Sequence, residues 1–160
     1  MNTAQNRFIP YRAARFIALL LAALFASHVY AGGWSLKDTD GVKYKLADQK
    51  GKWVVVNFWA PWCPPCLAEL PELNNLQQQH KDVLVIGVSV QYNRKQEVTD
   101  MVKKLSVTYP IVYGDEDVAA DFGGIEGLPT TFLYSPDGKL VSKQDGPVTQ
   151  KSLEQAMMQM

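Results

Sequence analysis

The sequence is poor in the residues from which metal and thiol sites are built. Its 160 residues contain two cysteines and two histidines, and one histidine falls within the first 31 residues. A zinc site needs about four ligands, so we expect no complete metal site within one chain. Acidic and basic side chains are equally numerous, 16 of each, and neither kind forms a long run. This balance argues against nucleic acid as a partner.

The first 31 residues have the layout of an export signal. Arginines without an acidic neighbour precede an apolar run over residues 16–26, and Val29 and Ala31 occupy the recognition positions of a cleavage site. The apolar run is shorter than the roughly 20 residues of a membrane-spanning helix. We expect residues 1–31 to be a signal peptide, with an uncleaved anchor as the alternative. The remaining chain would then work outside the cytoplasm, in the periplasm.

Residues 32–160 have the length of a single globular domain. Loss of Arg7, Arg12 and Arg15 with the leader reduces the basic side chains from 16 to 13, against 16 acidic ones, a formal charge of −3. No internal repeat or low-complexity tract occurs. The full chain is 47% hydrophobic, which is typical of a folded protein rather than a disordered one.

Two hydrophobic periods alternate along this domain. Apolar, β-branched runs at 52–60 and 83–90 predict strands that are buried on both faces. Stretches of helical spacing predict helices, the first of them bent at Pro71. The predicted helices cover 64–80, 94–107, 116–123 and 149–160. A short hairpin around DTDGVKYKL and a second one with a Pro-Asp-Gly turn at 136–138 add antiparallel strands. The pattern predicts an α/β sandwich with a mixed sheet.

Both cysteines lie in the segment WAPWCPPC, where the first buried strand gives way to the first helix. Reaction sites in open α/β sheets gather at such strand ends. Unpaired N–H groups and the helix dipole stabilise a thiolate at Cys63, and Cys66 follows one turn later. Pro64 and Pro65 stiffen the loop, and the first helical turn tolerates proline. The geometry predicts an attacking sulfur, Cys63, and a resolving sulfur, Cys66.

A structural disulfide is the main alternative for this cysteine pair, because exported proteins use disulfides for stability. Such a bond would close a very small loop and would add little entropic stability. A CxxC within a βαβ pattern favours a reactive dithiol instead.

The segment VVVNFWAPWCPPCLAELPEL resembles the thioredoxin superfamily, and within it the exported TlpA/ResA-like thiol-disulfide oxidoreductases. The resemblance covers residues 33–160. It implies a thioredoxin-like three-layer sandwich with a mixed central sheet, an N-terminal β-hairpin and an inserted helix–strand element. It also implies that Cys63 is the exposed nucleophile and Cys66 the buried resolving thiol.

Further site residues follow from the same resemblance. Pro129 in GLPTTF matches the cis-proline that faces the disulfide, and Leu128 before it would offer backbone hydrogen bonds to a bound polypeptide. Trp62 matches the aromatic residue before the first cysteine. Together with Pro64, these residues form the expected client-binding set.

Glu69 matches the acid of the CxxCxxE pattern, which in this branch tunes the thiols. The residues support such a role independently, since i to i+3 spacing on a helix places Glu69 near Cys66. A carboxylate there would raise the thiol pKa values or accept a proton from Cys66; the alternative is an ordinary solvated glutamate. Asn57 stands where cytoplasmic thioredoxins carry a buried acid, so one proton-transfer group is missing.

The resemblance implies an enzyme that reduces disulfides of client proteins and receives electrons from a membrane thiol transporter. No organic cofactor or metal is implied, and the oligomeric state is left open with a monomer as the working expectation. A disulfide donor or isomerase and a non-enzymatic client-binding module are the alternatives. Thr130 stands where the cytochrome c maturation branch usually carries an acid, which weakens that role. The absence of a histidine after His80 argues against copper delivery.

Overall fold

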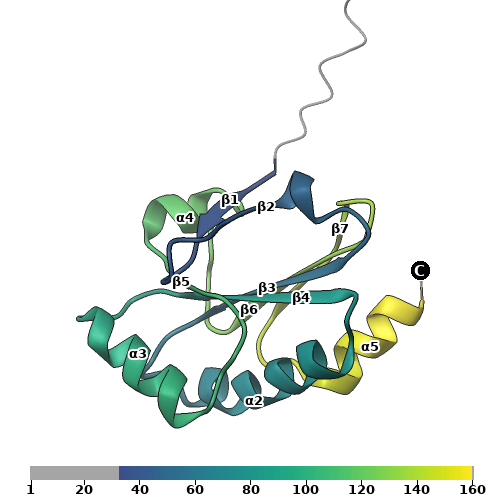
Figure 1. The fold of residues 1–160 in the computed structure, drawn as a ribbon. Coiled ribbons are helices and arrows are strands. Elements are labelled where there is room, and N and C mark those ends of the chain that lie inside the picture. Colours follow the sequence, from purple (N-terminus) through teal and green to yellow (C-terminus); the bar gives the residue numbers. More distant parts are fainter. Residues whose placement is uncertain (1–32, 160) are drawn as a thin grey trace, which may run out of the picture. The chain divides into compact units, whose positions relative to one another are not determined.

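The computed structural model describes residues 33–159 (Figure 1). The expected signal peptide, residues 1–31, lies outside it. Two sheets are formed: a hairpin of two strands and a sheet of five strands in the order β5-β4-β3-β6-β7. The strands are β1 (Ser35–Lys37), β2 (Lys43–Lys45), β3 (Trp53–Trp59), β4 (Val83–Ser89), β5 (Ile111–Tyr113), β6 (Thr130–Tyr134) and β7 (Leu140–Asp145). The helices are α2 (Pro64–Gln79), α3 (Lys95–Lys104), α4 (Glu116–Ala120) and α5 (Gln150–Met158), with a 3-10 turn at Leu46–Gln49.

The five-stranded sheet is mixed, as the sequence predicted. β3 runs parallel to β4 and antiparallel to β6, and β6 and β7 form the hairpin around the Pro-Asp-Gly turn. Gly138 in that turn has a φ of 81°, a conformation that glycine adopts without a steric penalty. β3 occupies the middle of the sheet, and its apolar run is buried on both faces.

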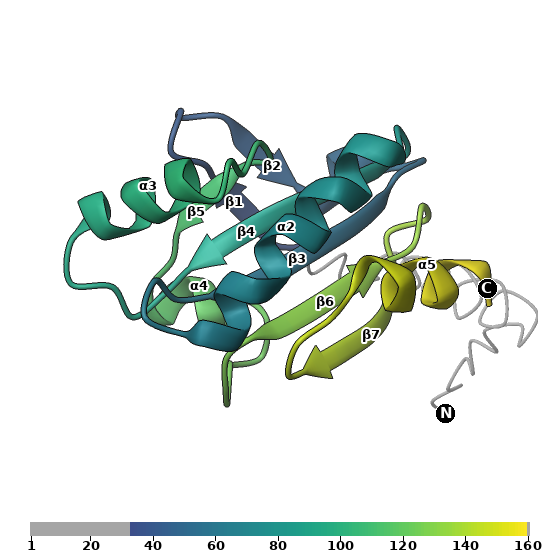
Figure 2. The same cartoon turned by 90° about the horizontal axis from the view of Figure 1, so that it is seen from below.

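The fold has three layers (Figures 1 and 2). Helices α2, α3 and α5 cover one face of the sheet, while the β1–β2 hairpin and α4 cover the other. Side chains of β3 alternate between the two faces of the sheet, because successive residues of a strand point to opposite faces. Val55 and Trp59 belong to the apolar cluster under α2, whereas Val54 and Phe58 belong to the apolar cluster on the opposite face. The expected thioredoxin-like sandwich with its N-terminal hairpin is confirmed.

Helix α2 runs through Pro71 to Gln79, close to the expected range of 64–80. Its buried stripe includes Leu70, Leu73 and Leu76, which are fully shielded from solvent. This stripe packs α2 against the sheet, so the start of the helix is held firmly at the carboxyl end of β3.

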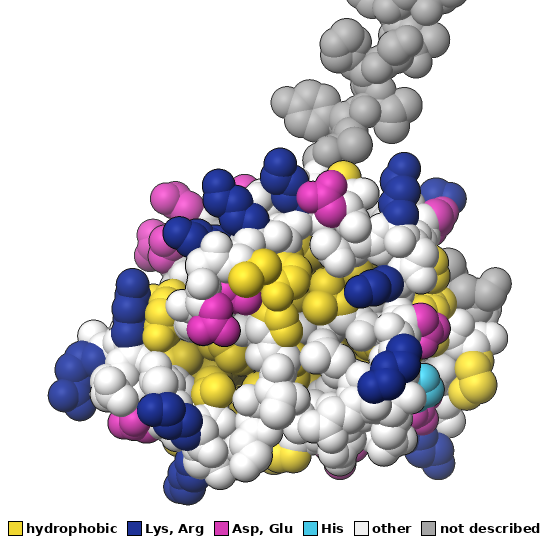
Figure 3. Space-filling model, viewed as in Figure 1, with side chains coloured by type: hydrophobic (Ala, Val, Ile, Leu, Met, Phe, Trp, Pro, Cys, Tyr) yellow, Lys and Arg dark blue, Asp and Glu magenta, His cyan; other side chains and the backbone are white. Residues whose placement is uncertain are grey.

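The inserted element between β4 and β6 consists of α3, β5 and α4. Helix α3 ends at Lys104, earlier than the expected 107, because the chain turns at Ser106, which has a φ of 53°. Among residues 33–159, no helix is long and apolar enough to cross a membrane. On the face that Figure 3 shows, basic and acidic side chains are interspersed around an apolar area.

Candidate active site

The two cysteines form a disulfide at the junction of β3 and α2. Cys63 is the N-cap residue of α2, and its sulfur accepts a hydrogen bond from the backbone N–H of Cys66 at 3.4 Å. Pro64 and Pro65 occupy the first helical positions, where a missing N–H leaves no bond unmade. The sulfur of Cys63 therefore lies at the positive end of the helix dipole.

The exposure of Cys63 differs from the expectation. We expected an exposed nucleophile, but the side chain is 3% exposed in the disulfide, against 0% for Cys66. The physical reason is packing: both cysteines belong to the apolar cluster under the sheet, and Leu128 packs against this cluster. In the oxidised protein, therefore, Cys63 presents only a small part of its surface to solvent.

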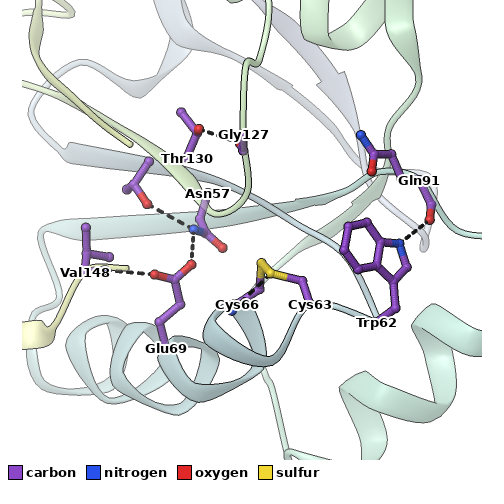
Figure 4. Close-up of a disulfide and its surroundings, with 10 residues drawn as sticks. Asn57, Trp62, Cys63, Cys66, Glu69, Gln91, Gly127, Thr130 and Val148 are labelled. Carbon is purple, nitrogen blue, oxygen red and sulfur yellow. Dashed lines mark hydrogen bonds between the residues drawn. A yellow bond between two sulfur atoms is a disulfide. The ribbon is translucent and has the colours of Figure 1, made fainter. Parts of the chain in front are cut away.

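Glu69 is buried rather than solvated. It is 2% exposed, and each carboxylate oxygen accepts one hydrogen bond: Oε1 from Asn57 Nδ2 at 2.7 Å and Oε2 from the Val148 N–H at 2.9 Å (Figure 4). Burial raises the pKa of Glu69 to about 7, although the hydrogen bonds from Val148 and Asn57 oppose the rise. A carboxyl group with this pKa can both take up and release a proton near neutral pH.

Asn57 connects Glu69 to the sheet. Its Nδ2 also donates to Thr131 Oγ1 on β6 at 3.0 Å, and the residue is fully buried in the middle of β3. The Asn57 amide does not ionise, so it orients the Glu69 carboxyl group without accepting a proton from it. The pKa of the buried Tyr109 is raised, first by burial and second by the charge of Glu69.

The Leu128–Pro129 peptide bond is cis, as the resemblance implied. Phe58 pairs with Thr130, and continuation of this antiparallel register places Pro129 beside the end of β3, where the chain enters the disulfide loop. The Thr130 hydroxyl lies 2.8 Å from the Gly127 carbonyl and 3.0 Å from Asp145 Oδ1, and the Pro129 carbonyl accepts from the Gly146 N–H. These bonds hold the loop that precedes β6.

Trp62 is the most prominent exposed side chain at the site. It is 59% exposed, and its Nε1 donates to the Gln91 carbonyl at 2.8 Å (Figure 4). Trp62 and Leu128 line the same groove, whose volume is about 680 Å³, and Trp62 also borders a second hollow of about 380 Å³. The indole of Trp62, the residue before Cys63, thus borders both depressions.

Of the sequence-predicted residues, Cys63 and Cys66 share a disulfide, and Trp62 and Leu128 line one groove. Pro64 and Pro129 line neither hollow beside Trp62. The client-binding roles of all four residues, Trp62, Pro64, Leu128 and Pro129, stay predictions. Sequence reasoning missed Val148, Thr131 and Gln91, the partners of Glu69, Asn57 and Trp62. No local signal marks them, because they lie 79, 74 and 29 residues away along the chain.

No group of three or more histidine, cysteine, aspartate or glutamate side chains within residues 33–159 is arranged to hold a metal ion. At the start of α2 the described structure presents two sulfurs, and the buried Glu69 carboxyl group lies on the same helix. A sandwich of this topology with a CxxC disulfide at the start of α2 and a cis-proline before β6 defines a thioredoxin-like thiol-disulfide oxidoreductase.

Comparison with known proteins agrees with this class. Residues 30–143 match the model of the AhpC/TSA family, and the chain belongs to this family. It is 35% identical over 129 residues to the thiol-disulfide oxidoreductase ResA of Bacillus subtilis, covering 79% of this chain and 72% of the relative. It is 34% identical over 131 residues to the thioredoxin-like protein YneN of the same organism, covering 79% and 76%.

Solved structures show the same fold. A thiol:disulfide interchange protein of the thioredoxin family from Chlorobium tepidum TLS superimposes with a TM-score of 0.71 at 27% identity, covering 79% of this chain and 92% of the other. The protein described here is thus a thioredoxin-like member of the AhpC/TSA family, with thiol-disulfide oxidoreductases of the ResA type as its homologues.

Proposed function

We propose that this protein reduces disulfides of exported client proteins by dithiol exchange through Cys63 and Cys66. The observation that carries the exchange chemistry is the position of Cys63 as the N-cap of α2, with its sulfur accepting the Cys66 N–H. The reducing direction rests on the resemblance to the exported TlpA/ResA-like proteins, because a thiolate at Cys63 serves exchange in either direction. After reduction, the same N–H and the helix dipole stabilise a thiolate at Cys63 and lower its pKa. Cys66 is the third residue of α2 rather than its N-cap, so its sulfur does not have the position that stabilises a thiolate at Cys63.

The exchange proceeds in two steps. The Cys63 thiolate attacks one sulfur of the client disulfide, which forms a mixed disulfide and releases the other client sulfur as a thiolate. The Cys66 thiolate then attacks Cys63, forms the Cys63–Cys66 disulfide and releases the second client thiolate. Two electrons pass to the client, and the protein ends in the oxidised state that the structure contains.

Glu69 serves the second step in this proposal. Cys66 is buried, and burial in apolar surroundings disfavours the thiolate that must attack. Glu69 follows Cys66 by about one helical turn and has a pKa raised to about 7. Its carboxylate accepts the proton of Cys66 as the resolving attack begins, and later returns it to solvent or to a leaving thiolate.

Trp62, Leu128 and Pro129 hold the client in this proposal. The support is that Trp62, which precedes Cys63, and Leu128, which precedes the cis-proline, line one groove. The leader sequence supports work outside the cytoplasm, in the periplasm. Because that compartment is oxidising, the dithiol has to be regenerated by an electron donor, and a membrane thiol transporter supplies this need.

Trapping with single-cysteine variants tests the proposal. A synthetic peptide with one internal disulfide is mixed with reduced wild-type protein, with Cys66→Ser and with Cys63→Ser, and adducts are detected by intact mass and located by peptide mapping. We expect a one-to-one adduct at Cys63 in Cys66→Ser, none in Cys63→Ser, and turnover without an adduct in wild type.

An adduct in Cys63→Ser alone would reverse the roles of the two sulfurs. No adduct in either variant, together with no loss of the peptide disulfide in wild type, would favour the client-binding module whose own disulfide is inert. If the wild-type protein in its oxidised form instead oxidises a dithiol peptide faster than its reduced form reduces the disulfide, disulfide donation is the better description.

A further inference from the structure

The groove beside Trp62 is lined by acidic side chains and by no basic ones. Its volume is about 680 Å³, and three carboxylate residues line it: Asp115 and Glu116 at the start of α4, and Glu126 in the loop before Pro129. No lysine or arginine is among the lining residues of this groove. The groove therefore has a negative field next to Trp62, the residue that precedes Cys63.

The carboxylates differ in how much of their charge is available. Asp115 is the N-cap of α4, and its Oδ1 accepts the Val118 N–H at 2.9 Å. Glu116 and Glu126 are exposed, and neither forms an ion pair among the residues that the structure describes. Two carboxylate side chains thus line the groove without a cationic partner from this part of the chain.

The rest of the groove fits a long cationic side chain. Val90, Ala119, Ile125 and Leu128 give it apolar surface, which suits the aliphatic stem of lysine or arginine. Trp62 is fixed by its bond to the Gln91 carbonyl and stays 59% exposed. Tryptophan is the aromatic side chain that attracts cations most strongly. The apolar lining, the Trp62 indole and the carboxylates of the groove therefore all favour a lysine or arginine side chain.

Two lining residues of the groove, Trp62 and Leu128, are chain neighbours of the redox site. Trp62 immediately precedes Cys63, and Leu128 immediately precedes the cis-proline. A polypeptide that binds beside Trp62 and Leu128 while its cysteine reacts with Cys63 therefore has this groove within reach of a neighbouring side chain. A side chain with a long aliphatic stem and a positive end makes both apolar and ionic contacts there.

We propose that this groove selects client segments that carry a lysine or arginine close to the disulfide cysteine. The inference rests on the proposed function, because it names the client class for the same Cys63–Cys66 pair. Opposite charges across such an interface act chiefly on the rate of association and on specificity. An acidic side chain at the same client position is repelled by Glu116 and Glu126.

The test uses two synthetic peptides of equal length, each with one internal disulfide, that differ only in arginine or glutamate beside the cysteines. The purified protein is reduced beforehand, and the single-turnover rate of exchange is measured at low salt and again at about 0.5 M salt, where screening reduces interactions between exposed charges. We expect the arginine peptide to react about tenfold faster at low salt, with most of the difference lost at high salt.

Two double variants test whether the faster exchange with the arginine peptide depends on the carboxylates of the groove. Glu116→Gln with Glu126→Gln removes two charges from the lining and should reduce the preference to about twofold or less. Asp40→Asn with Asp48→Asn removes two charges from the N-terminal segment, outside this lining, and should leave the preference intact. The double groove variant should still reduce the arginine peptide, because its sulfurs are unchanged.

The outcomes separate this inference from the proposed function. Equal rates for both peptides, or a preference that survives in the groove variant, would overturn the inference while the exchange itself stands. No exchange with either peptide would overturn the proposed function. A preference that declines as protein concentration rises would show that a second copy occupies the groove, and would also contradict the inference.

Discussion

The Glu69 carboxylate accepts the backbone N–H of Val148 at 2.9 Å, across 79 residues of sequence. This bond joins the helix that carries the disulfide to the segment that leads into α5. Thr149 follows at once and caps α5 in a capping box with Ser152. The second oxygen of Glu69 binds Asn57 on β3, so one buried carboxyl group connects α2, the central strand and the C-terminal helix.

The first prediction concerns pH and stability. The pKa of Glu69 is raised from 4.5 to about 7 in the folded protein, so the folded state binds the proton more tightly than the unfolded chain. Its contribution to stability is complete below pH 4.5 and is lost as the pH rises through 7. Glu69→Gln should remove this dependence, a change on the order of 1 to 3 kcal/mol in the free energy of unfolding between pH 5 and pH 8.

Denaturant unfolding of the oxidised protein at several pH values measures this effect. Glu72→Gln is the matched control, because Glu72 lies on the same helix and its Oε2 accepts the Gln150 N–H at 3.2 Å. The control should keep the wild-type pH dependence. If Glu69→Gln keeps it as well, Glu69 is not the group that titrates.

The second prediction separates client binding from sulfur chemistry. Trp62→Ala should change the free energy of unfolding by less than about 1 kcal/mol, because the side chain is largely exposed. It should slow exchange with a peptide disulfide about fivefold, the size of a lost contact worth about 1 kcal/mol. Exchange with 4,4′-dithiodipyridine, which is too small to span the groove, should stay at the wild-type rate.

Leu140→Ala is the control for Trp62→Ala, since Leu140 is a large side chain that is 53% exposed on β7. It should leave both rates unchanged. Equal slowing of both substrates by Trp62→Ala would place Trp62 in the chemistry of Cys63 rather than in client binding.

The third prediction concerns Gly87 on β4. A Cβ atom at this position would lie 2.9 Å from Ile111 Cδ1, 2.9 Å from Tyr109 Cε2 and 3.2 Å from Trp59 Nε1. Gly87→Ala should therefore destabilise the protein by about 1 to 3 kcal/mol, as overpacking of a close-packed core does. The midpoint of denaturant unfolding measures the change.

Gly127→Ala provides the comparison for Gly87→Ala. Nothing lies within 4 Å of a Cβ atom built at Gly127, so its midpoint should stay close to wild type. If Gly87→Ala and Gly127→Ala both unfold at the wild-type midpoint, the prediction is wrong. In that case β5 and the Trp59 side chain move to accommodate the added methyl group without a loss of stability.

The sequence predicted those parts of the fold that depend on local pattern. The runs at 52–60 and 83–90 became β3 and β4, and the Pro-Asp-Gly turn joined β6 to β7. The CxxC position at the start of a helix followed from the change of hydrophobic period after Trp59. Each of these features is encoded within about ten residues, so no tertiary information is needed to find it.

The remaining features depend on contacts between distant segments. Glu69 is buried among distant segments: Val148, just before α5, and Asn57 on β3 both donate hydrogen bonds to it. The spacing along α2 alone does not distinguish this buried glutamate from a solvated one. Likewise, Cys63 is shielded by the cluster that Leu128 joins from the loop before β6. The acidic groove combines the start of α4 with the loop around Glu126, and no single stretch of sequence reveals that combination.

The midpoint potential of the Cys63–Cys66 couple tests the central claim most directly. The purified protein is equilibrated with thiol–disulfide buffers, and the fluorescence of Trp62 and Trp59, near the disulfide in the sequence, reports the oxidised fraction. A dedicated reductase predicts a value more negative than roughly −200 mV, towards the roughly −270 mV of thioredoxin. A value less negative than roughly −200 mV, towards the roughly −120 mV of a strong exported oxidant, would contradict the account and identify a disulfide donor.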